Sequence, residues 1–237
     1  MRLDVVTLFP DFFRWSFSHS LLKRAQAGGR VEFHLHNPRD FAEDRHRTVD
    51  EKPFGGGAGM VLKPEPVFRC VESIRGKGWV ILLTPRGRAL TQEKAARLSK
   101  KKHLVLLCGH YEGMDERICK GLVDEEISIG DFVTMGGEAP ALCLIESIVR
   151  WVPGVLGNPE SLKEESFSSS ENGITKKMLE FPQYTRPRAF RKMKVPPVLL
   201  SGNHQAIEAW RGREALRLTR RNRPDLLKNK KETRSFT

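Results

Sequence analysis

Residues 79–109 read WVILLTPRGRALTQEKAARLSKKKHLVLLCG and contain two continuous apolar runs with a helical pattern between them. The runs Trp79–Thr84 and Leu104–Cys108 predict strands buried on both faces, because their apolar residues do not alternate with polar ones. Residues 91–102 predict a helix with Thr91 as its N-cap. A strand, a helix and a second strand in this order are typical of a mostly parallel sheet covered by helices, and hence of an α/β fold.

The same alternation of elements continues on both sides of this stretch. Further strands are predicted at Arg2–Phe9, Val31–His36 and within Glu126–Val133. Further helices are predicted at Asp11–Ala27, Pro64–Ile74 and Ala139–Val152. Residues 37–63 predict irregular structure, since they include the glycine-rich segment Phe54–Met60.

Basic residues are concentrated at the C-terminal end of the chain. The formal net charge is +12, and residues 174–237 contain 17 Lys and Arg against 5 Asp and Glu, whereas residues 1–173 are neutral overall. A neutral body with a basic tail favours a polyanionic partner, and a solvated basic surface without a specific partner is the alternative. The tail lacks a broad apolar face, so membrane binding is not expected.

The chain is predicted to have three parts. Residues 1–160 form the α/β domain, residues 161–180 form a flexible linker between domains, and residues 181–237 form a small basic helical domain. The linker is indicated by the polar, serine-rich sequence SLKEESFSSSENG that begins at Ser161. A helical pattern that begins at Asn203 indicates the last domain.

Several classes of protein are excluded by what the sequence lacks. No apolar run reaches about 18 residues, so no transmembrane helix is expected, and the start MRLDVVTLFPDFF does not resemble a signal peptide. The four cysteines are too far apart for a zinc or disulfide framework, which favours the reduced cytoplasm. The phosphate-binding and dinucleotide-binding glycine motifs are absent. Closely spaced histidine pairs on a helix are also absent, so no metal site is predicted.

Three glycine-containing loops follow predicted apolar strands, at residues 82–87, 108–117 and 128–138. In an open parallel sheet, ligands bind beyond the carboxyl ends of the strands, and glycines allow a ligand to approach the backbone closely. Together the loops predict a pocket for a small ligand with apolar and polar parts, although each loop alone is better explained as an ordinary tight turn. No catalytic assignment follows from the residues alone. Arg150 at a helix end complements the helix dipole, and Glu164-Glu165 suits a solvated acidic loop.

Several sequence blocks, in their order along the chain, resemble one enzyme family. They are LFPDFF from Leu8, HRTVDEKPFGGGAGMVLKP from His46, LTPRGR from Leu83, CGHYEGMDERI from Cys108, ISIGDFVTMGGE from Ile127, PGVLG from Pro153, YTRP from Tyr184 and PPVLLSGNH from Pro196. This ordered set is similar to the TrmD family, the bacterial tRNA (guanine-N1)-methyltransferases of the SPOUT superfamily. These enzymes methylate guanosine at tRNA position 37.

The resemblance implies a fold, a cofactor and an assembly. SPOUT methyltransferases have a mostly parallel sheet with a deep trefoil knot, and they act as homodimers with active sites at the subunit interface. The family's methyl donor is S-adenosylmethionine, which is held by the knot loops. The corresponding cofactor-binding residues here are Leu82, Leu83, Thr84, Pro85, Gly109, Tyr111, Glu112, Ile129, Gly130, Phe132, Thr134, Gly136, Gly137 and Pro140.

The resemblance also implies two catalytic residues. Guanine N1 becomes nucleophilic when it loses its proton, and a positioned carboxylate that removes a proton typically contributes ~10²–10⁴ in rate. A guanidinium can stabilise the negative charge that then develops on O6. By motif position Arg150 has the O6 role, and Glu165 stands where the family has an aspartate base. Two further departures are a longer segment at 168–179 and Met135 in place of a small hydroxyl residue.

The basic tail acquires a partner through the same resemblance, since the family's C-terminal domain binds the anticodon arm of tRNA. The candidate tRNA-binding residues are Asp50, Arg186, Arg211, Arg217 and Arg220. The sequence leaves a role for Mg²⁺ open, because a sulfonium methyl donor does not require a metal. Two alternatives remain: a related enzyme that methylates a ribose 2′-hydroxyl, and a tRNA-binding protein that has lost catalysis through the change at Glu165.

Overall fold

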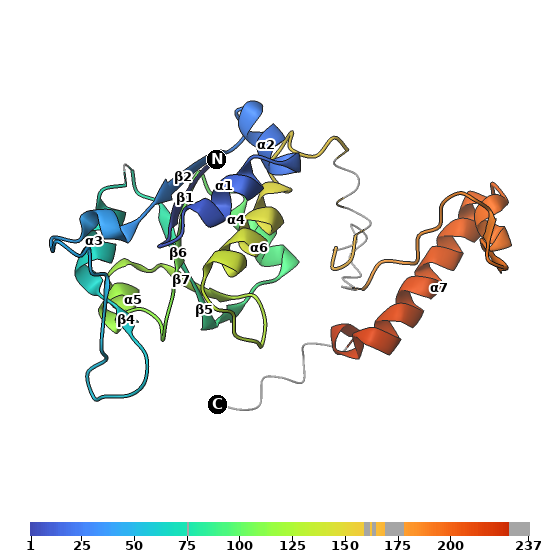
Figure 1. Cartoon of the computed structure of the whole chain (residues 1–237). Coiled ribbons are helices and arrows are strands. Elements are labelled where there is room, and N and C mark those ends of the chain that lie inside the picture. Colours follow the sequence, from blue (N-terminus) through green and yellow to red (C-terminus); the bar gives the residue numbers. More distant parts are fainter. Residues whose placement is uncertain (75, 159–161, 163–164, 169–177, 228–237) are drawn as a thin grey trace. The chain divides into compact units, whose positions relative to one another are not determined.

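A five-stranded parallel sheet forms the centre of the first part of the chain (Figure 1). Its strands are β1 (Arg2–Val6), β2 (Glu32–His36), β5 (Trp79–Ala89), β6 (His103–Cys108) and β7 (Glu125–Ser128). They lie in the order β2-β1-β6-β5-β7, and every neighbouring pair is parallel. The parallel sheet predicted from the apolar runs is therefore confirmed. The computed structural model describes residues 1–74, 76–158, 162, 165–168 and 178–227.

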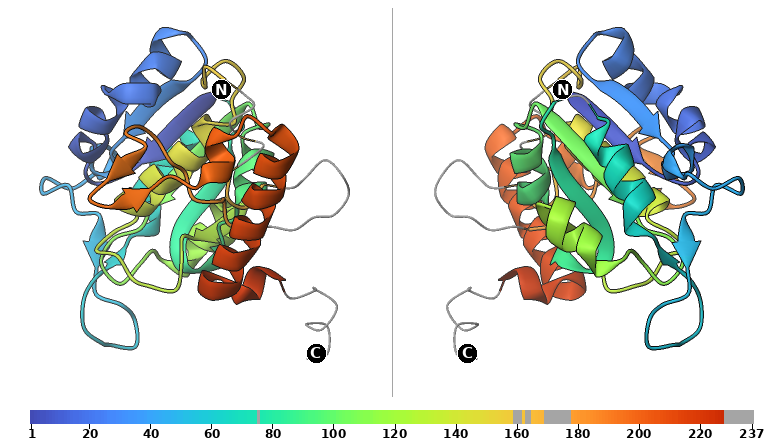
Figure 2. Two further views of the ribbon diagram at one scale, coloured as in Figure 1. Left: turned by 90° about the vertical axis from the view of Figure 1, so that its right-hand side faces the viewer. Right: turned by 90° about the vertical axis from the view of Figure 1, so that its left-hand side faces the viewer.

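Helices cover both faces of the sheet, as Figures 1 and 2 show. The helices of this part are α1 (Asp11–Phe17), α2 (Ser20–Ala27), α3 (Pro64–Glu72), α4 (Gln92–Leu98), α5 (Glu116–Leu122) and α6 (Glu138–Val149). Leu3 and Val5 of β1 belong to the apolar cluster packed by α1, α2, α4 and α6. Val6 belongs to the cluster on the other face, with α3 and α5. Successive residues of a strand point to opposite faces, so one apolar run supplies both cores.

Strand β5 differs from the prediction, because it does not end at Thr84. Both Leu83 and Arg88 pair with Ile127 of β7, so the four residues between them leave the ladder as a bulge. Gly87 is required where the strand rejoins, since a Cβ there would meet the backbone of Ile127 at 2.5 Å. Pro85 is tolerated in this position because a bulged residue does not donate to the ladder.

Three further differences concern helices and short strands. The predicted helix 11–27 is two helices, because the backbone is extended at His19 between α1 and α2. Helix α5 was not predicted; its N-cap is Asp115, whose side chain accepts from the backbone N–H of Arg117 at 2.9 Å. Within residues 37–63 lie a 3-10 helix and a short antiparallel pair. These elements are the 3-10 helix Pro38–Phe41, β3 (Asp50–Glu51) and β4 (Val61–Leu62).

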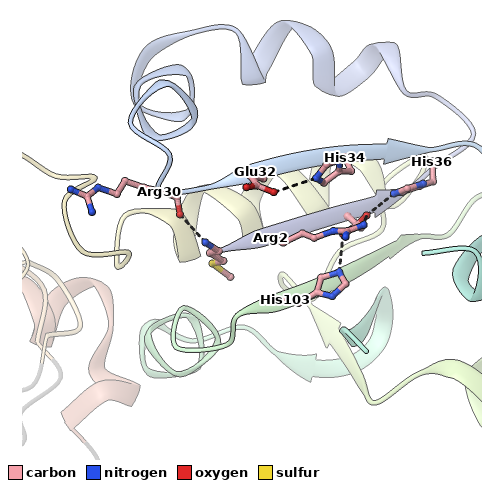
Figure 3. Close-up of polar contacts among 8 residues, drawn as sticks. Arg2, Arg30, Glu32, His34, His36 and His103 are labelled. Carbon is pink, nitrogen blue, oxygen red and sulfur yellow. Dashed lines mark hydrogen bonds and ion pairs between the residues drawn. The ribbon is translucent and has the colours of Figure 1, made fainter. Parts of the chain in front are cut away.

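A buried carboxylate joins three strands of the sheet at Asp4 of β1. Asp4 is fully buried, and Arg2 donates to it from Nε at 2.7 Å. Nε2 of His36 on β2 lies 2.6 Å from one oxygen, and Nε2 of His103 on β6 lies 2.8 Å from the other. Figure 3 shows His36 and His103 on the strands at either side of the strand that carries Arg2, with dashed lines marking their contacts. Three polar partners make burial of this charge tolerable.

The chain divides into two compact units, residues 1–157 and 158–237. The second contains β8 (Ala189–Phe190), β9 (Met193–Lys194), two 3-10 helices (Pro197–Leu200 and Pro224–Leu227) and α7 (His204–Asn222). Asn203 is the N-cap of α7, and its side chain accepts from the N–H of Ala206 at 3.0 Å. The buried hydroxyl of Thr219 accepts from the N–H of Leu179 at 2.9 Å, which attaches the preceding segment to α7. None of the helices in the described residues is both long and apolar enough to cross a membrane.

Candidate functional site

A cavity of about 300 Å³ lies at the bulge of β5 and at the carboxyl ends of β6 and β7. Its wall is formed by the first predicted loop, which is the β5 bulge, and by the second and third predicted loops, which follow β6 and β7. Every cofactor-binding residue implied by the resemblance lines it except Gly130. These residues are Leu82, Leu83, Thr84, Pro85, Gly109, Tyr111, Glu112, Ile129, Phe132, Thr134, Gly136, Gly137 and Pro140. Gly130 lies next to the lining, where a Cβ would meet the ring of Phe132.

The second and third loops are in direct backbone contact. The N–H of Gly137 donates to the carbonyl of Gly109 at 2.7 Å, and His110 and Gly136 form an isolated antiparallel bridge. A Cβ at Gly137 would lie 2.7 Å from the Cα of Cys108, so only glycine permits this approach. The glycines of the two motifs therefore bring the loops together as well as exposing backbone to the cavity.

Arg86 holds the β5 bulge against two neighbouring elements. Its guanidinium donates to both oxygens of Glu126 on β7, at 2.8 and 3.1 Å, and to Glu116 on α5 at 2.9 Å. These hydrogen bonds raise the pKa of Arg86. Because Arg86 also lines the cavity, the network supports one wall of the site. The sequence analysis did not identify this role, since the two glutamates lie 30 and 40 residues away along the chain.

A second buried carboxylate lies behind the third loop. Glu138 is the first residue of α6 and is 6% exposed. Its Oε1 accepts from the hydroxyl of Thr7 at 2.8 Å, and its Oε2 lies 3.9 Å from Nε2 of His110, which lines the cavity. The helix N-terminus also favours the negative charge. A Cβ at Gly136 would collide with both Glu138 and His110. Glu138 and His110 lie within the quoted motifs, but nothing in the sequence linked them to Thr7.

Two thiols border the cavity, and neither is poised to act as a nucleophile. Burial raises the pKa of Cys108, and the charge of Glu138 raises it further. Burial also raises the pKa of Cys119, with the neighbouring Arg86 acting in the opposite direction. Since the thiolate is the reactive form, the cavity is suited to binding a ligand between loops and not to covalent cysteine chemistry.

The glycine-rich segment contacts the second loop, although it comes from a distant part of the sequence. The N–H of Glu112 donates to the carbonyl of Met60 at 3.0 Å, and a Cβ at Gly59 would collide with the Glu112 carboxylate. Asp50 lies on β3 at the base of this segment, paired with Leu62 of β4. The segment therefore lies against the second loop. Among the described residues, no three His, Cys, Asp or Glu side chains are grouped so that they could hold a metal ion.

Comparison with known proteins identifies the family of the chain. Residues 1–229 match the family model described as tRNA (Guanine-1)-methyltransferase TrmD. The chain belongs to the TrmD family. This match includes both units, so the likeness extends well beyond the motifs that line the cavity.

Curated relatives of the TrmD family are similar over almost the whole chain, and each has the name tRNA (guanine-N(1)-)-methyltransferase. The protein of Dictyoglomus turgidum is 55% identical over 228 residues, which are 96% of this chain and 90% of the relative. That of Geobacillus kaustophilus is 53% identical over 230 residues, 96% of this chain and 91% of the relative. That of Staphylococcus epidermidis is 52% identical over 229 residues, with the same two shares.

The TrmD-family position at Arg150 lies away from the cavity within one chain. Arg150 follows the last residue of α6, whereas Gly137 precedes its first residue. At a rise of 1.5 Å per residue, the two positions are separated by about 20 Å along the helix. Arg150 is not part of the cavity lining. The structure therefore brings the predicted cofactor residues together but does not place Arg150 among them.

The remaining TrmD-family positions lie in the second unit. Glu165 is half-buried there, next to Ser166, whose hydroxyl accepts from the N–H of Glu180 at 3.0 Å. Arg186 and Arg220 are exposed. Arg217 is bound to Glu214 at 2.6 Å, and the guanidinium of Arg211 lies 4.7 Å from the centre of the Phe181 ring. Residues 169–177, most of the longer segment, are outside the described residues.

Proposed function

We propose that this protein transfers a methyl group from S-adenosylmethionine to N1 of guanosine at position 37 of tRNA, next to the anticodon. One observation carries the proposal. The three loops that line a single cavity are also the blocks that the chain shares with the TrmD family. Relatives 50–55% identical over the chain are named as enzymes of this activity, whereas nothing favours ribose methylation.

The cavity is suited to the methyl donor. Leu82, Leu83 and Ile129 supply apolar walls for a flat ring, and the glycine-rich backbone of the loops supplies N–H and C=O groups. When bound, S-adenosylmethionine supplies a methyl group activated by its positively charged sulfur. Leu83, which precedes the bulge of β5, pairs with Cys108, which ends β6, so the rigid sheet fixes the position of both walls.

The chain's own residues supply the proton chemistry in this proposal. The Glu165 carboxylate accepts the proton of guanine N1, and the nitrogen electron pair then forms the new N–C bond while the methyl–sulfur bond breaks. The Arg150 guanidinium stabilises the negative charge that develops on O6. Glu165 is one methylene longer than the family's aspartate, and its loop backbone would have to compensate for the added length.

We also propose that the active form is a homodimer with the knotted SPOUT topology. Arg150 and the cavity lie at opposite ends of α6, so a second copy offers a route by which both could contribute to one site. Large apolar side chains beside the cavity support an interface there, since Phe132, Val133 and Met135 are 57, 82 and 96% exposed. Close packing of Gly137 on Gly109 supports the knot, because the third loop lies directly against the second.

We assign tRNA binding to the basic second unit and the cytoplasm as the location of the reaction. Arg186 and Arg220 are exposed and suited to phosphate contacts. Arg211 and Arg217 are already engaged with Phe181 and Glu214, so they would contact RNA only by sharing or exchanging these partners. Asp50 remains a candidate near the target base.

The proposal is tested by methyl transfer from labelled S-adenosylmethionine to unmodified tRNA with guanosine at positions 36 and 37. The digested product is analysed for modified nucleosides. We expect 1-methylguanosine at position 37. A 2′-O-methylated nucleoside would point to the related ribose methyltransferases instead. Binding of cofactor and tRNA without transfer would identify a tRNA-binding protein that has lost catalysis.

A further inference from the structure

The β8–β9 hairpin of the second unit has an unusual turn. Its two central residues, Arg191 and Lys192, have φ values of 47° and 66°, and the pair Phe190 and Met193 closes the two-residue loop. Positive φ at both central positions is the conformation of a type I′ turn, which strongly favours Asn-Gly. Two long side chains in this conformation are strained.

The same hairpin is strongly basic. Residues 186–194 read RPRAFRKMK, with five basic residues and no acidic one, and no Asp or Glu occurs between Glu180 and Glu208. Arg186, Arg188, Arg191, Lys192 and Lys194 are all exposed. The described contacts include no ion pair of these side chains with a carboxylate. Mutual repulsion at the turn therefore adds to its strain, and an anionic partner would relieve it.

An apolar pair lies among these charges. Phe190 and Met193 are directly opposite in the antiparallel register, so their side chains share one face of the hairpin. They are 57% and 65% exposed, and the Arg191 guanidinium lies 5.3 Å from the centre of the Phe190 ring. A basic surface next to an exposed aromatic ring is typical of sites that bind phosphates and stack on a base. Figure 1 shows the hairpin, in orange, near the N-terminal end of α7.

We propose that the β8–β9 hairpin is an RNA-binding element, in which Arg191 and Lys192 bind phosphates of the tRNA and Phe190 stacks on an exposed base. This inference rests on the proposed function for the identity of the RNA. Asn-Gly would be more stable than Arg191-Lys192 in this two-residue loop. A function for the two cationic side chains explains why the strained sequence is retained.

The test separates the stability of the turn from its binding. The variant R191N/K192G introduces the favoured turn sequence and removes two positive charges. We expect its thermal unfolding midpoint to equal or exceed that of the parent, while its affinity for unmodified tRNA falls about tenfold near 0.1 M salt. The slope of log affinity against log salt concentration should become shallower by about 2, since each phosphate contact contributes about 1.

The matched control is K23N/K100N, which removes two exposed lysines from the first unit and lowers the net charge equally. We expect its affinity for tRNA to change less than twofold. A hairpin variant with the affinity and salt slope of this control would overturn the proposal. The proposal would also be overturned if R191N/K192G weakened binding to vesicles containing phosphatidylserine but left binding to tRNA unchanged.

A third variant addresses the aromatic ring. Phe190→Ser removes no charge, so we expect at least about fivefold weaker tRNA binding with an unchanged salt slope, as for loss of one stacked base. Unchanged affinity would overturn the stacking part of the proposal. In steady-state methylation, the hairpin variants should raise KM for tRNA with little change in kcat, because the proposed role of the hairpin is RNA binding and not proton or methyl transfer.

These results distinguish the hairpin inference from the proposed function. A parent that forms 1-methylguanosine, together with a hairpin variant that binds tRNA as the control does, would overturn the inference alone. A parent that binds tRNA through the hairpin but forms no 1-methylguanosine would overturn the proposed function and support the inference.

Discussion

At the scale of single residues, the site depends on glycines, which have no side chain, as much as on residues that have one. Gly137 lets the third loop touch the backbone of the second, and Gly136 leaves the space that Glu138 and His110 fill. The proposed reacting groups, Arg150 and Glu165, are not among the residues in these glycine contacts.

Glu165→Gln is expected to retain cofactor binding and to lose most turnover, because an amide cannot accept the N1 proton. The single-turnover rate of methyl transfer should fall by ~10²–10⁴. Glu164→Gln is the matched control, since it makes the same change one position earlier. Full activity in the Glu165 variant would remove this residue from the mechanism, and a large loss in the Glu164 variant would transfer the role.

Arg150→Ala is expected to slow the chemical step while S-adenosylmethionine binds as before, because Arg150 is not part of the cavity lining. Loss of one donor to a developing oxyanion typically costs ~10²–10³ in rate. Arg150→Lys should recover part of the rate, since it keeps the charge but loses the planar fork. An unchanged single-turnover rate in the alanine variant would refute the O6 role.

At the scale of elements, the β5 bulge shows how the sheet makes a binding surface. Residues 84–87 leave the ladder and the strand then resumes, so the cavity wall is anchored at both ends of the bulge. Arg86 adds a side-chain anchor to α5 and β7. At the other side of the sheet, Asp4 joins β1 to β2 and β6 through two histidines.

Arg86→Met is expected to loosen the cavity wall without removing any group that touches guanine. KM for S-adenosylmethionine should rise about fivefold or more, with kcat much less affected, because the bulge loses its bonds to Glu116 and Glu126. Arg88→Met, two residues further along the strand, is the control. Equal kinetic constants in the Arg86 variant and the parent would contradict a positioning role.

Acidification is expected to weaken the fold through Asp4. Burial alone raises the pKa of Asp4, but hydrogen bonds from His36, Arg2 and His103 outweigh it and leave the pKa lowered. A carboxyl with a lowered native pKa stabilises the fold above its unfolded pKa of about 3.9, and this contribution is lost as pH falls toward the native pKa. The free energy of unfolding should therefore decrease below about pH 5.

Asp4→Asn tests this assignment by denaturant unfolding at pH 7 and pH 4. We expect a loss of about 3–5 kcal/mol at pH 7, typical of a broken buried ionic network, and a smaller further loss on acidification than in the parent. Asp11→Asn is the control, because its ion pair with Arg14 is highly exposed and should contribute little. An identical pH dependence in the Asp4 variant and the parent would exclude Asp4 as the titrating group.

At the scale of the whole molecule, the proposed cofactor-binding and catalytic residues do not lie together in the first unit of one chain. The cavity lies at the start of α6, and Arg150 lies at its end. Glu165 belongs to the second unit. The proposed homodimer would offer a route by which Arg150 and the cavity contribute to one site, and the exposed apolar side chains near the cavity are suited to its interface.

Met135→Asp is expected to weaken the homodimer, because it places a charge in the proposed interface at a side chain that is 96% exposed in the single chain. Sedimentation should show a dimer for the parent and a shift toward monomer for the variant, with methyl transfer lost in parallel. Leu200→Asp is the control on an exposed apolar residue of the second unit. A fully active parent that sediments as a monomer would contradict the proposal.

The sequence by itself determined the existence of the five strands of the parallel sheet and the glycine-containing segments that form the cavity wall. The apolar runs at Trp79–Thr84 and Leu104–Cys108 predict strands buried on both faces, because no polar residue interrupts them. The glycine-containing segments after these runs contain the family motifs. Thr91 was recognisable as an N-cap because its bonding partner, the N–H of Lys94, lies three residues away. Local chemistry of this kind is readable because both partners occur within one turn of chain.

Only the tertiary structure decided which distant residues support the site. The return of β5 to the ladder after its bulge depends on β7, and Arg86 depends on glutamates 30 and 40 residues away. Thr7 meets Glu138 across 131 residues. Such contacts form where the parallel sheet brings remote strand ends to one edge, so no local pattern encodes them. The separation of Arg150 from the cavity likewise follows from the length and direction of α6.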